Sequence, residues 1–308
     1  MGKIAFVFPG QGAQAVGMGK DAYESSAAAK AIYDKADEAL GYSISKLSFE
    51  GPEEELRQTA NTQPALLATS VALLEVYKEQ GLKPDYVAGH SLGEYSALVA
   101  AGVLEFADAV KLVRARGQFM EQAVPGGQGA MAAVLGAERA ALQALCSEIT
   151  AAGTVVELAN VNCPGQIVVS GSAAGVAAVV ERGKEAGAKR VIPLEVSGPF
   201  HSSLMQPAAD KLAEALAQAE FRGASVPVVA NVHARPVTSG AELRELLVKQ
   251  VVSPVQWEDT IAYLIGEGVD TFVEIGSGTV LAGLIKKIDK SVRIVSVNSA
   301  AAASAAAE

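Results

Sequence analysis

Apolar and polar positions alternate along the chain in the way expected of successive strands and helices. Residues 3–8, KIAFVF, form a short apolar run that predicts a buried strand, and the glycine-rich loop PGQGAQAVGMG follows it. A second short apolar run, at 86–89, is followed by LGEYSALVAAGVL, a segment rich in helix formers. Strands that lead through loops into helices predict an α/β layer fold.

The pattern changes between Gly129 and Val196. Strands are expected at 130–135, 155–161, 166–170 and 190–196, and helices at 138–150 and 173–186. This β-α-β-β-α-β order is that of a ferredoxin-like unit. The loops VPGGQG and SGPFHS bound the segment. We therefore expect residues 127–197 to form an inserted ferredoxin-like subdomain.

The larger domain then comprises residues 1–126 and 198–308. After the insertion the pattern predicts helices at 203–219 and 280–288 and strands at 226–231, 271–275 and 292–297. We expect a large α/β-hydrolase-like domain with a mostly parallel sheet. The tail SAAAASAAAE, at 299–308, is low in complexity and is expected to fray or to form a helical remnant.

Composition limits the partners and the location. Half of the 308 residues are hydrophobic, enough for a large core. The net charge of −9 argues against a nucleic acid or an anionic membrane as the main partner. Cys146 and Cys163 lack metal-ligand spacing, and the N-terminal apolar run ends at Pro9, too early for a signal peptide or a membrane span. We expect a cytoplasmic monomer with no metal site and no bound cofactor.

A candidate nucleophile lies in the stretch GHSLGEYSAL at 89–98. Gly89-His90-Ser91-Leu92-Gly93 fits G-x-S-x-G, in which small flanking residues let a strand turn sharply into a helix and hold the serine at the apex. The expected strand before Ser91 and the expected helix after it supply the setting that this turn requires. The pattern thus indicates a serine nucleophile.

Three histidines could act as the base that activates Ser91: His90, His201 and His233. His90 is the direct neighbour of Ser91 and is expected to point to the other side of the chain. His201 lies where the inserted segment returns to the larger domain, a common place for a cleft, and we favour it over His233. No acidic residue between Ser91 and His201 sits in an obvious strand-end loop, so a neutral acceptor such as a backbone carbonyl is expected to orient the histidine.

Arg116 lies on the apolar face of the helix expected at 106–124. The residues of that face recur at three- and four-residue intervals and are Ala109, Leu112, Val113, Phe119, Met120 and Ala123. A guanidinium on this face needs a carboxylate partner, since it cannot lose its proton. From the residues alone, an internal salt bridge or a side chain that reaches out to solvent is favoured over a carboxylate on the substrate.

Several motifs together resemble one family over essentially the whole chain. They are FPGQG at 8–12, NTQPAL at 61–66, GHSLGEYSAL at 89–98, the helix around Arg116, PGQIVVSG at 164–171, FHSSLM at 200–205 and QVVSPVQW at 250–257. In this order and spacing they resemble the malonyl-CoA:acyl carrier protein transacylases of type II (dissociated) fatty acid synthesis.

The resemblance implies a ping-pong transfer of the malonyl group through an ester on Ser91, which supplies fatty acid chain elongation. His201 would serve as base and then as acid, and the main-chain carbonyl of Gln250 would steady it in place of a carboxylate. The backbone N–H groups of Gln11 and Leu92 would form the oxyanion hole. The substrates implied are malonyl-CoA and holo acyl carrier protein.

The resemblance also assigns substrate contacts. Arg116 would pair with the malonyl carboxylate, which reverses the preference drawn from the residues alone. Gln63 and Asn162 would support the site. Phe200 resembles the bulky aromatic of malonyl-selective acyltransferases of polyketide synthesis, which disfavours a 2-methyl group by roughly 1–3 kcal/mol.

The family's carrier is strongly acidic, so a protein with a net charge of −9 needs a basic surface to hold it. Candidates are Lys189 and Arg190 beside the inserted segment and Lys286 and Lys287 in GLIKKI. Each of these is equally consistent with a solvated charge at the end of a helix or strand.

Other functions stay open. A serine esterase or thioesterase would pass the acyl group to water, and a scaffold that only binds the carrier would need no nucleophile. A discrete acyltransferase that serves a polyketide synthase shares the same chemistry and differs in its carrier.

Overall fold

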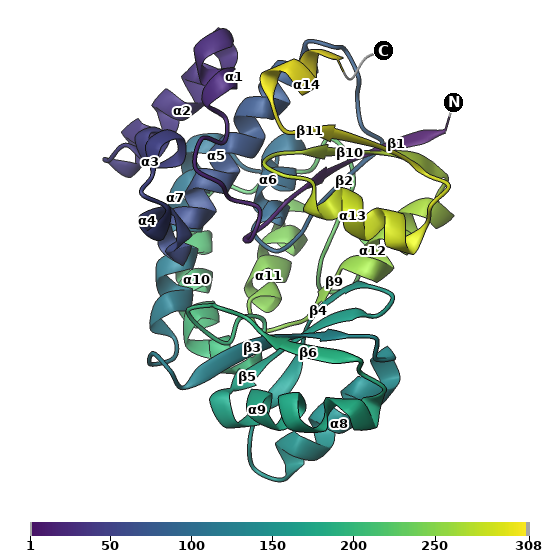
Figure 1. The fold of residues 1–308 in the computed structure, drawn as a ribbon. Helices are drawn as coiled ribbons and strands as arrows, with labels where there is room; N and C mark the ends of the chain where they lie inside the picture. The colour runs from purple at the N-terminus through teal and green to yellow at the C-terminus, as the bar shows by residue number, and fades with distance from the viewer. Residues whose placement is uncertain (1, 306–308) are drawn as a thin grey trace.

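A computed structural model describes residues 2–305. Two sheets, each flanked by helices, lie one above the other in Figure 1. In sequence order the strands are β1 Lys3–Phe8, β2 Tyr86–Gly89, β3 Gly129–Leu135, β4 Val156–Cys163, β5 Gln166–Ser172, β6 Arg190–Pro193, β7 Val228–Val229, β8 Pro236–Val237, β9 Val255–Gln256, β10 Val269–Ile275 and β11 Arg293–Val297.

The helices cover both sheets. They are α1 Lys20–Ser25, α2 Ala27–Leu40, α3 Ile44–Glu50, α4 Glu53–Arg57, α5 Thr59–Lys78, α6 Gly93–Ala100, α7 Phe106–Gln122, α8 Arg139–Ala151, α9 Ala173–Arg182, α10 Gln206–Ala217, α11 Gly240–Gln250, α12 Trp257–Gly266, α13 Val280–Ile288 and α14 Ala300–Ala305. Short 3-10 turns occupy Gly183–Ala186 and Ser203–Met205. No helix within residues 2–305 combines the length and the apolar character needed to cross a bilayer.

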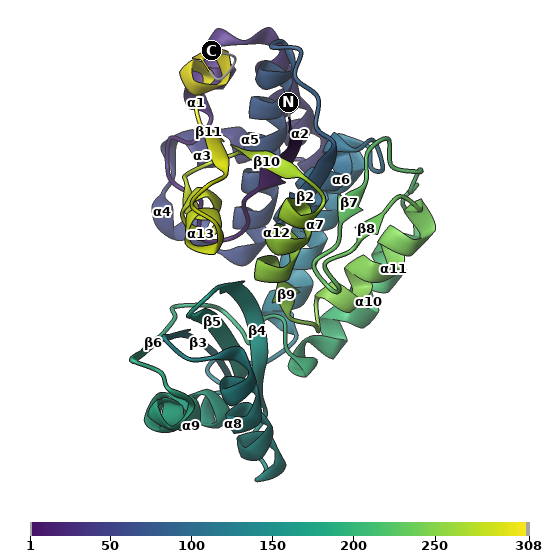
Figure 2. The same cartoon turned by 90° about the vertical axis from the view of Figure 1, so that its right-hand side faces the viewer.

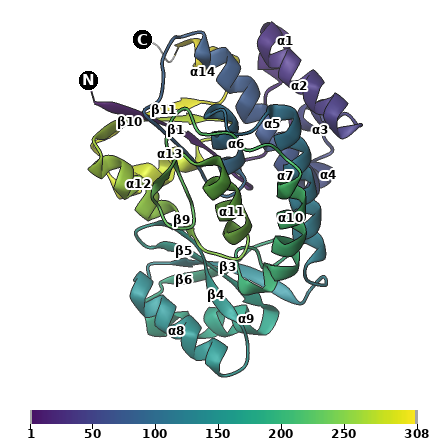
Figure 3. The same ribbon diagram turned by 180° about the vertical axis from the view of Figure 1, so that it is seen from behind.

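The upper sheet has the order β11-β10-β1-β2-β7-β8 and is parallel except for the last pair. Side chains of β1 alternate between its two faces: Ala5 and Val7 pack with α12 and α13, and Phe6 and Phe8 join the core on the opposite face. Helices on both faces bury the sheet, which explains why its strands are almost wholly apolar. Figure 3, seen from behind, shows α7, α10 and α11 beside one another on this side of the molecule.

The lower sheet has the order β6-β3-β5-β4-β9 and is antiparallel except where β9 joins β4. In Figure 2, α8 and α9 cover the side of this sheet that faces away from the upper sheet. We call each sheet with the helices that cover it the upper unit and the lower unit. A separate hydrophobic cluster fills the space between this sheet and the helices α8 and α9. All its buried members come from residues 132–188. The mixed α/β fold expected from the sequence is confirmed.

Two expected strands are shorter in the structure. The strand expected at 226–231 pairs only at Val228–Val229, because Pro227 has no N–H and the N–H of Asn231 is donated to the side chain of Glu94. The strand expected at 190–196 ends at Pro193. The alanine-rich tail forms α14 up to Ala305, and residues 306–308 lie outside the described residues.

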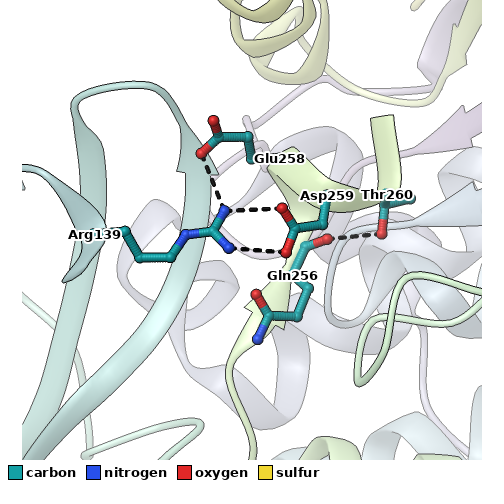
Figure 4. A network of polar contacts seen from close by, with 5 residues as sticks. All are labelled: Arg139, Gln256, Glu258, Asp259 and Thr260. Atoms are coloured by element: carbon teal, nitrogen blue, oxygen red, sulfur yellow. Dashed lines mark hydrogen bonds and ion pairs between the residues drawn. The ribbon is translucent and has the colours of Figure 1, made fainter. Parts of the chain in front are cut away.

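Two sets of contacts hold the upper and lower units together. β9 extends the lower sheet by pairing with β4, so that Asn160 lies opposite Val255. Arg139, at the start of α8, forms a two-pronged ion pair with Asp259 at 2.9 and 3.0 Å and a longer contact with Glu258 at 3.4 Å, both in the first turn of α12 (Figure 4). These contacts fix the lower sheet against the upper unit.

Candidate active site

Ser91 lies at the sharp turn between β2 and α6. Its φ is +53°, a left-handed conformation that a serine adopts only where the surroundings impose it. A Cβ on Gly89 would collide with the backbone of Gly93, and a Cβ on Gly93 would collide with the carbonyl oxygen of Phe8. Both glycines of G-x-S-x-G are therefore required by the close approach of the chain to itself.

His201 makes the contacts expected of a base. Its Nε2 lies 2.7 Å from the Ser91 Oγ, and its Nδ1 lies 2.9 Å from the backbone oxygen of Gln250. The carbonyl can only accept, so Nδ1 carries the hydrogen and Nε2 is free to accept the serine proton. Burial, and then the charge of Arg116, lower the pKa of His201 to about 3, so the imidazole is neutral near pH 7.

The other two histidines have different partners. His90 is held at 2.8 Å from the Oδ1 of Asn162, and its ring packs against Trp257. His233 is only partly buried, and its Nδ1 accepts from the backbone N–H of Arg235. Within the described chain, neither contacts the Ser91 hydroxyl.

Arg116 is 1 % exposed and points at the same serine. Its Nη1 donates to Gln63 Oε1 at 2.8 Å, and its Nη2 donates to Gln250 Oε1 at 2.9 Å and to Ser91 Oγ at 3.2 Å. Between residues 2 and 305 no carboxylate lies within 4.0 Å of it, and its Nε has no partner. The internal salt bridge and the solvent-reaching side chain are both absent from this part of the chain. A buried guanidinium with only neutral acceptors can bind an anion.

Ser91 and His201 open onto a cleft of about 610 Å³ between the upper and lower units. Its walls come from both: Gln11, Gly12, Gln14, Glu54, Arg57, Gln58, Thr59, His90, Met120 and Phe200 from the upper unit and its loops, and Met131, Asn160, Leu194, Glu195, Val196 and Ser197 from the segment that carries the lower sheet. Such a cleft can hold a large acyl donor with its reacting end at Ser91.

Comparisons with known proteins agree with this geometry. A family model for the acyl transferase domain matches residues 5–305. The malonyl CoA-acyl carrier protein transacylase of Bacillus subtilis (strain 168) is 57% identical over 298 residues, which are 97% of this chain and 94% of that protein. The chain belongs to the malonyl CoA-acyl carrier protein transacylase family. The family indicated by the sequence motifs is confirmed, and the transacylase is an acyltransferase.

Solved structures agree over almost the whole transacylase chain. The acyl carrier protein S-malonyltransferase of Vibrio cholerae O1 superposes with a TM-score of 0.96 at 48% identity and covers 99% of each chain. A malonyl-transacylase in complex with a type II PKS acyl-carrier protein superposes with a TM-score of 0.95 at 44% identity, covering 99% of this chain and 98% of that one.

Two backbone N–H donors of the transacylase lie at or beside the sharp turn that carries Ser91. β1 and β2 are parallel neighbours, with Phe8 opposite Gly89, so the loop that carries Gln11 leaves the sheet beside the turn that carries Leu92. Within residues 2–305 the N–H groups of Gln11 and Leu92 donate to no protein acceptor. Both groups are therefore available to an oxygen of a bound substrate.

The other expected substrate residues fall into two groups. Gln63 is buried against Arg116, and Phe200 lines the cleft beside His201. Asn162 lies behind His90 and does not line the cleft. Its contact with the site is made through the His90 ring.

The four candidate docking residues, Lys189, Arg190, Lys286 and Lys287, are all exposed and lie outside the cleft. The first two lie just before β6 and at its start, and the other two lie in the last turn of α13, which packs on β4. In the described part of the chain none of the four has an ion-pair partner within 4.0 Å.

Sequence reasoning missed two polar residues of the transacylase site, Glu94 and Asn231. Both are buried, and both contact Gln250. A signal existed for each: Glu94 is the one charged residue of the otherwise apolar α6, and Asn231 interrupts the apolar run VPVVANV. No group of three or more His, Cys, Asp or Glu that could hold a metal occurs in residues 2–305.

Proposed function

We propose that Ser91 carries a malonyl group from malonyl-CoA to the phosphopantetheine thiol of holo acyl carrier protein, in the cytoplasm and as a monomer. The names of the similar transacylases supply the two substrates. The observation that carries the proposal is Arg116, a buried guanidinium with no carboxylate partner in residues 2–305, whose Nη2 lies 3.2 Å from the Ser91 Oγ. An acyl group that ends in a carboxylate supplies the missing anion.

In the first half-reaction Nε2 of His201 takes the proton of Ser91 as its Oγ attacks the thioester carbon. The carbonyl oxygen becomes an oxyanion that the N–H groups of Gln11 and Leu92 stabilise. The carbon–sulfur bond then breaks, and His201 returns its proton to the departing CoA sulfur. A malonyl ester on Ser91 is left.

In the second half-reaction the carrier's thiol gives its proton to His201, and its sulfur attacks the ester carbon. The carbon–oxygen bond to Ser91 breaks, and His201 reprotonates the serine. Arg116 holds the malonyl carboxylate through both halves, while Gln63 and the side chain of Gln250 fix the guanidinium. Asn162 supports the site by orienting His90.

Phe200 narrows the cleft beside His201 and sets a preference for malonyl over methylmalonyl groups. One additional methyl in an apolar pocket changes the free energy by roughly 1–3 kcal/mol, so the discrimination is partial.

The unpaired charges of Lys189, Arg190, Lys286 and Lys287 would receive the acidic carrier. They lie on the units that form the two walls of the cleft, so a carrier bound to them could send its phosphopantetheine arm in toward Ser91.

We also propose that residues 127–197 are an inserted ferredoxin-like subdomain and that residues 1–126 and 198–308 form an α/β-hydrolase-like domain. The separate hydrophobic cluster between residues 132 and 188 supports this division. The order β6-β3-β5-β4, with α8 and α9 on one face, fits the ferredoxin-like description.

Intact-protein mass spectrometry after brief mixing with malonyl-CoA tests the function. We expect a malonyl adduct on Ser91 that persists in buffer and is discharged by holo acyl carrier protein, and no adduct on the Ser91→Ala variant. An adduct that disappears without carrier would identify a hydrolase. No adduct on the native protein would leave only a scaffold.

A polyketide carrier is the second candidate acceptor, because one structural relative was solved with a type II PKS acyl-carrier protein. The rates at which a fatty acid carrier and a polyketide carrier discharge malonyl-Ser91 decide between them. We expect the fatty acid carrier to be faster.

A further inference from the structure

A carboxyl group is buried directly beneath the nucleophile. Glu94 lies in the first turn of α6, three residues after Ser91, and is 1 % exposed. Between residues 2 and 305 no Lys, Arg or His nitrogen lies within 4.0 Å of it. A buried carboxyl without a cation is costly to a fold unless hydrogen bonds satisfy it.

Glu94 holds the side chain of Gln250. Its Oε2 accepts from Gln250 Nε2 at 2.9 Å, while Gln250 Oε1 accepts from Arg116 Nη2 at 2.9 Å. A carboxylate only accepts hydrogen bonds and a guanidinium only donates them, so these two charges together decide which way the amide points. Gln250 thus bridges two opposite charges that do not touch.

The same contacts lead to the reacting atoms. The backbone oxygen of Gln250 accepts the Nδ1 hydrogen of His201. The side-chain Nε2 of Gln250 also donates to the backbone oxygen of Ser91 at 3.0 Å. Asn231, whose N–H donates to Glu94 at 3.3 Å, accepts the N–H of Ser91 at 2.8 Å and donates to the backbone oxygen of Gly89 at 2.7 Å. Glu94 therefore contacts both residues that hold the serine turn and the base.

We propose that Glu94 is a positioning residue for acyl transfer: its carboxylate orients Gln250 and Asn231, and through them Ser91, His201 and Arg116. The substrate in this inference rests on the proposed function, but the positioning of the nucleophile does not. When Glu94 is protonated, its hydrogen competes for the place of the Gln250 Nε2 hydrogen. When the proton sits on Oε2, the amide turns, and Arg116 loses Gln250 Oε1, one of its three acceptors. The ionised form builds the site.

The groups that face Glu94 allow its ionisation to be observed. Burial raises the pKa of Glu94 to about 7 and lowers that of His201 to about 3. Burial also raises the pKa of Tyr95 on α6 and lowers that of His90, and Arg116 on α7 keeps its proton. Glu94 is the group of this cluster that changes charge near neutral pH, so the rate of Ser91 modification should rise as the pH rises through about 7.

The test compares Glu94→Gln with the native protein. Glutamine keeps the length and one neutral acceptor but removes the charge. We expect both the phosphonylation of Ser91 by a fluorophosphonate and the formation of malonyl-Ser91 to slow by about 10- to 100-fold at about pH 8, with no rise through neutral pH. The KM for malonyl-CoA should also rise, because Arg116, which holds the malonyl carboxylate in the proposed function, is no longer oriented by the side chain of Gln250.

Glu274→Gln is the matched control. Glu274 is also fully buried, at the end of β10, but its two oxygens accept the backbone N–H groups of Leu281 and Ala282 at the start of α13, outside the cleft. We expect this variant to keep both rates within about two-fold of the native protein. A loss of rate shared by both variants would make Glu94 merely a structural residue and overturn the proposal.

Rates for Glu94→Gln within about two-fold of the native protein would also overturn it. So would a native fluorophosphonate profile without a rise near pH 7, a measurement that does not depend on whether the variant folds. If the native protein reacts with the fluorophosphonate but not with malonyl-CoA, the proposed function fails, and the fluorophosphonate rates alone decide the role of Glu94.

Discussion

Arg116 shows how one residue can point to the chemical nature of a ligand. Its guanidinium is buried next to a serine nucleophile, and the three oxygens that it contacts belong to Gln63, Gln250 and Ser91, all uncharged. A structural arginine at this depth is expected to have a carboxylate partner from its own chain. A ligand that ends in a carboxylate would supply this partner.

Arg116→Ala should therefore discriminate between substrates. We expect kcat/KM for malonyl-CoA to fall by an amount equivalent to about 2–5 kcal/mol, while that for acetyl-CoA, which has no carboxylate, changes little. Arg114→Ala is the control, because Arg114 is on the same helix but bonds Asn61 and the backbone of Ala60 outside the cleft. Equal losses for the two CoA esters would show that Arg116 is structural.

Among the elements, the decisive feature is the close packing of the start of α6 against the ends of the parallel strands β1 and β2. The α6 backbone passes so close to the end of β1 that Gly93 has no room for a side chain against Phe8. This close approach directs Ser91 into the cleft and brings the Gln11 loop beside it. The G-x-S-x-G motif therefore reflects a packing requirement, the close approach of α6 to β1.

Gly93→Ala should shift α6 away from β1. We expect the free energy of unfolding to drop by about 1–3 kcal/mol and the labelling of Ser91 to slow. Gly283→Ala, in the middle of α13 where an added methyl meets open space, should instead raise stability by up to about 1 kcal/mol. Thermal and urea unfolding measure both changes. A Gly93→Ala protein as stable and reactive as the native one would contradict this account of the turn.

The whole molecule carries buried ionisable groups whose effects on stability oppose one another. Burial raises the pKa of Glu274 to about 7, so its contribution to stability is present below its ordinary pKa of 4.5 and is lost as the pH rises through about 7. Burial lowers the pKa of His201 to about 3 from 6.5, so its contribution is present above pH 6.5 and is lost as the pH falls toward 3. Between these values the two trends partly cancel.

Single variants should separate the two trends. We expect the stability advantage of the native protein over Glu274→Gln to shrink by up to about 3 kcal/mol between about pH 4.5 and 8. The stability advantage of the native protein over His201→Ala should instead shrink as the pH falls from neutrality. Urea unfolding at a series of pH values measures both, and parallel pH profiles for the native protein and Glu274→Gln would refute the assignment for Glu274.

Features that depend on residues close together in the chain could be predicted from the sequence. The alternation of apolar runs and helix formers predicted the mixed α/β fold, the G-x-S-x-G spacing predicted the turn at Ser91, and the motifs along the chain indicated the transacylase family. It named His201 and Arg116 as candidates, but from the residues alone it favoured an internal partner for Arg116 and missed Glu94 and Asn231. Only the tertiary structure brought together Ser91, Arg116, His201 and Gln250, which are separated by 25 to 159 residues in the chain. Local patterns decide backbone conformation, whereas the partner of a buried charge is decided by which distant segments pack against it.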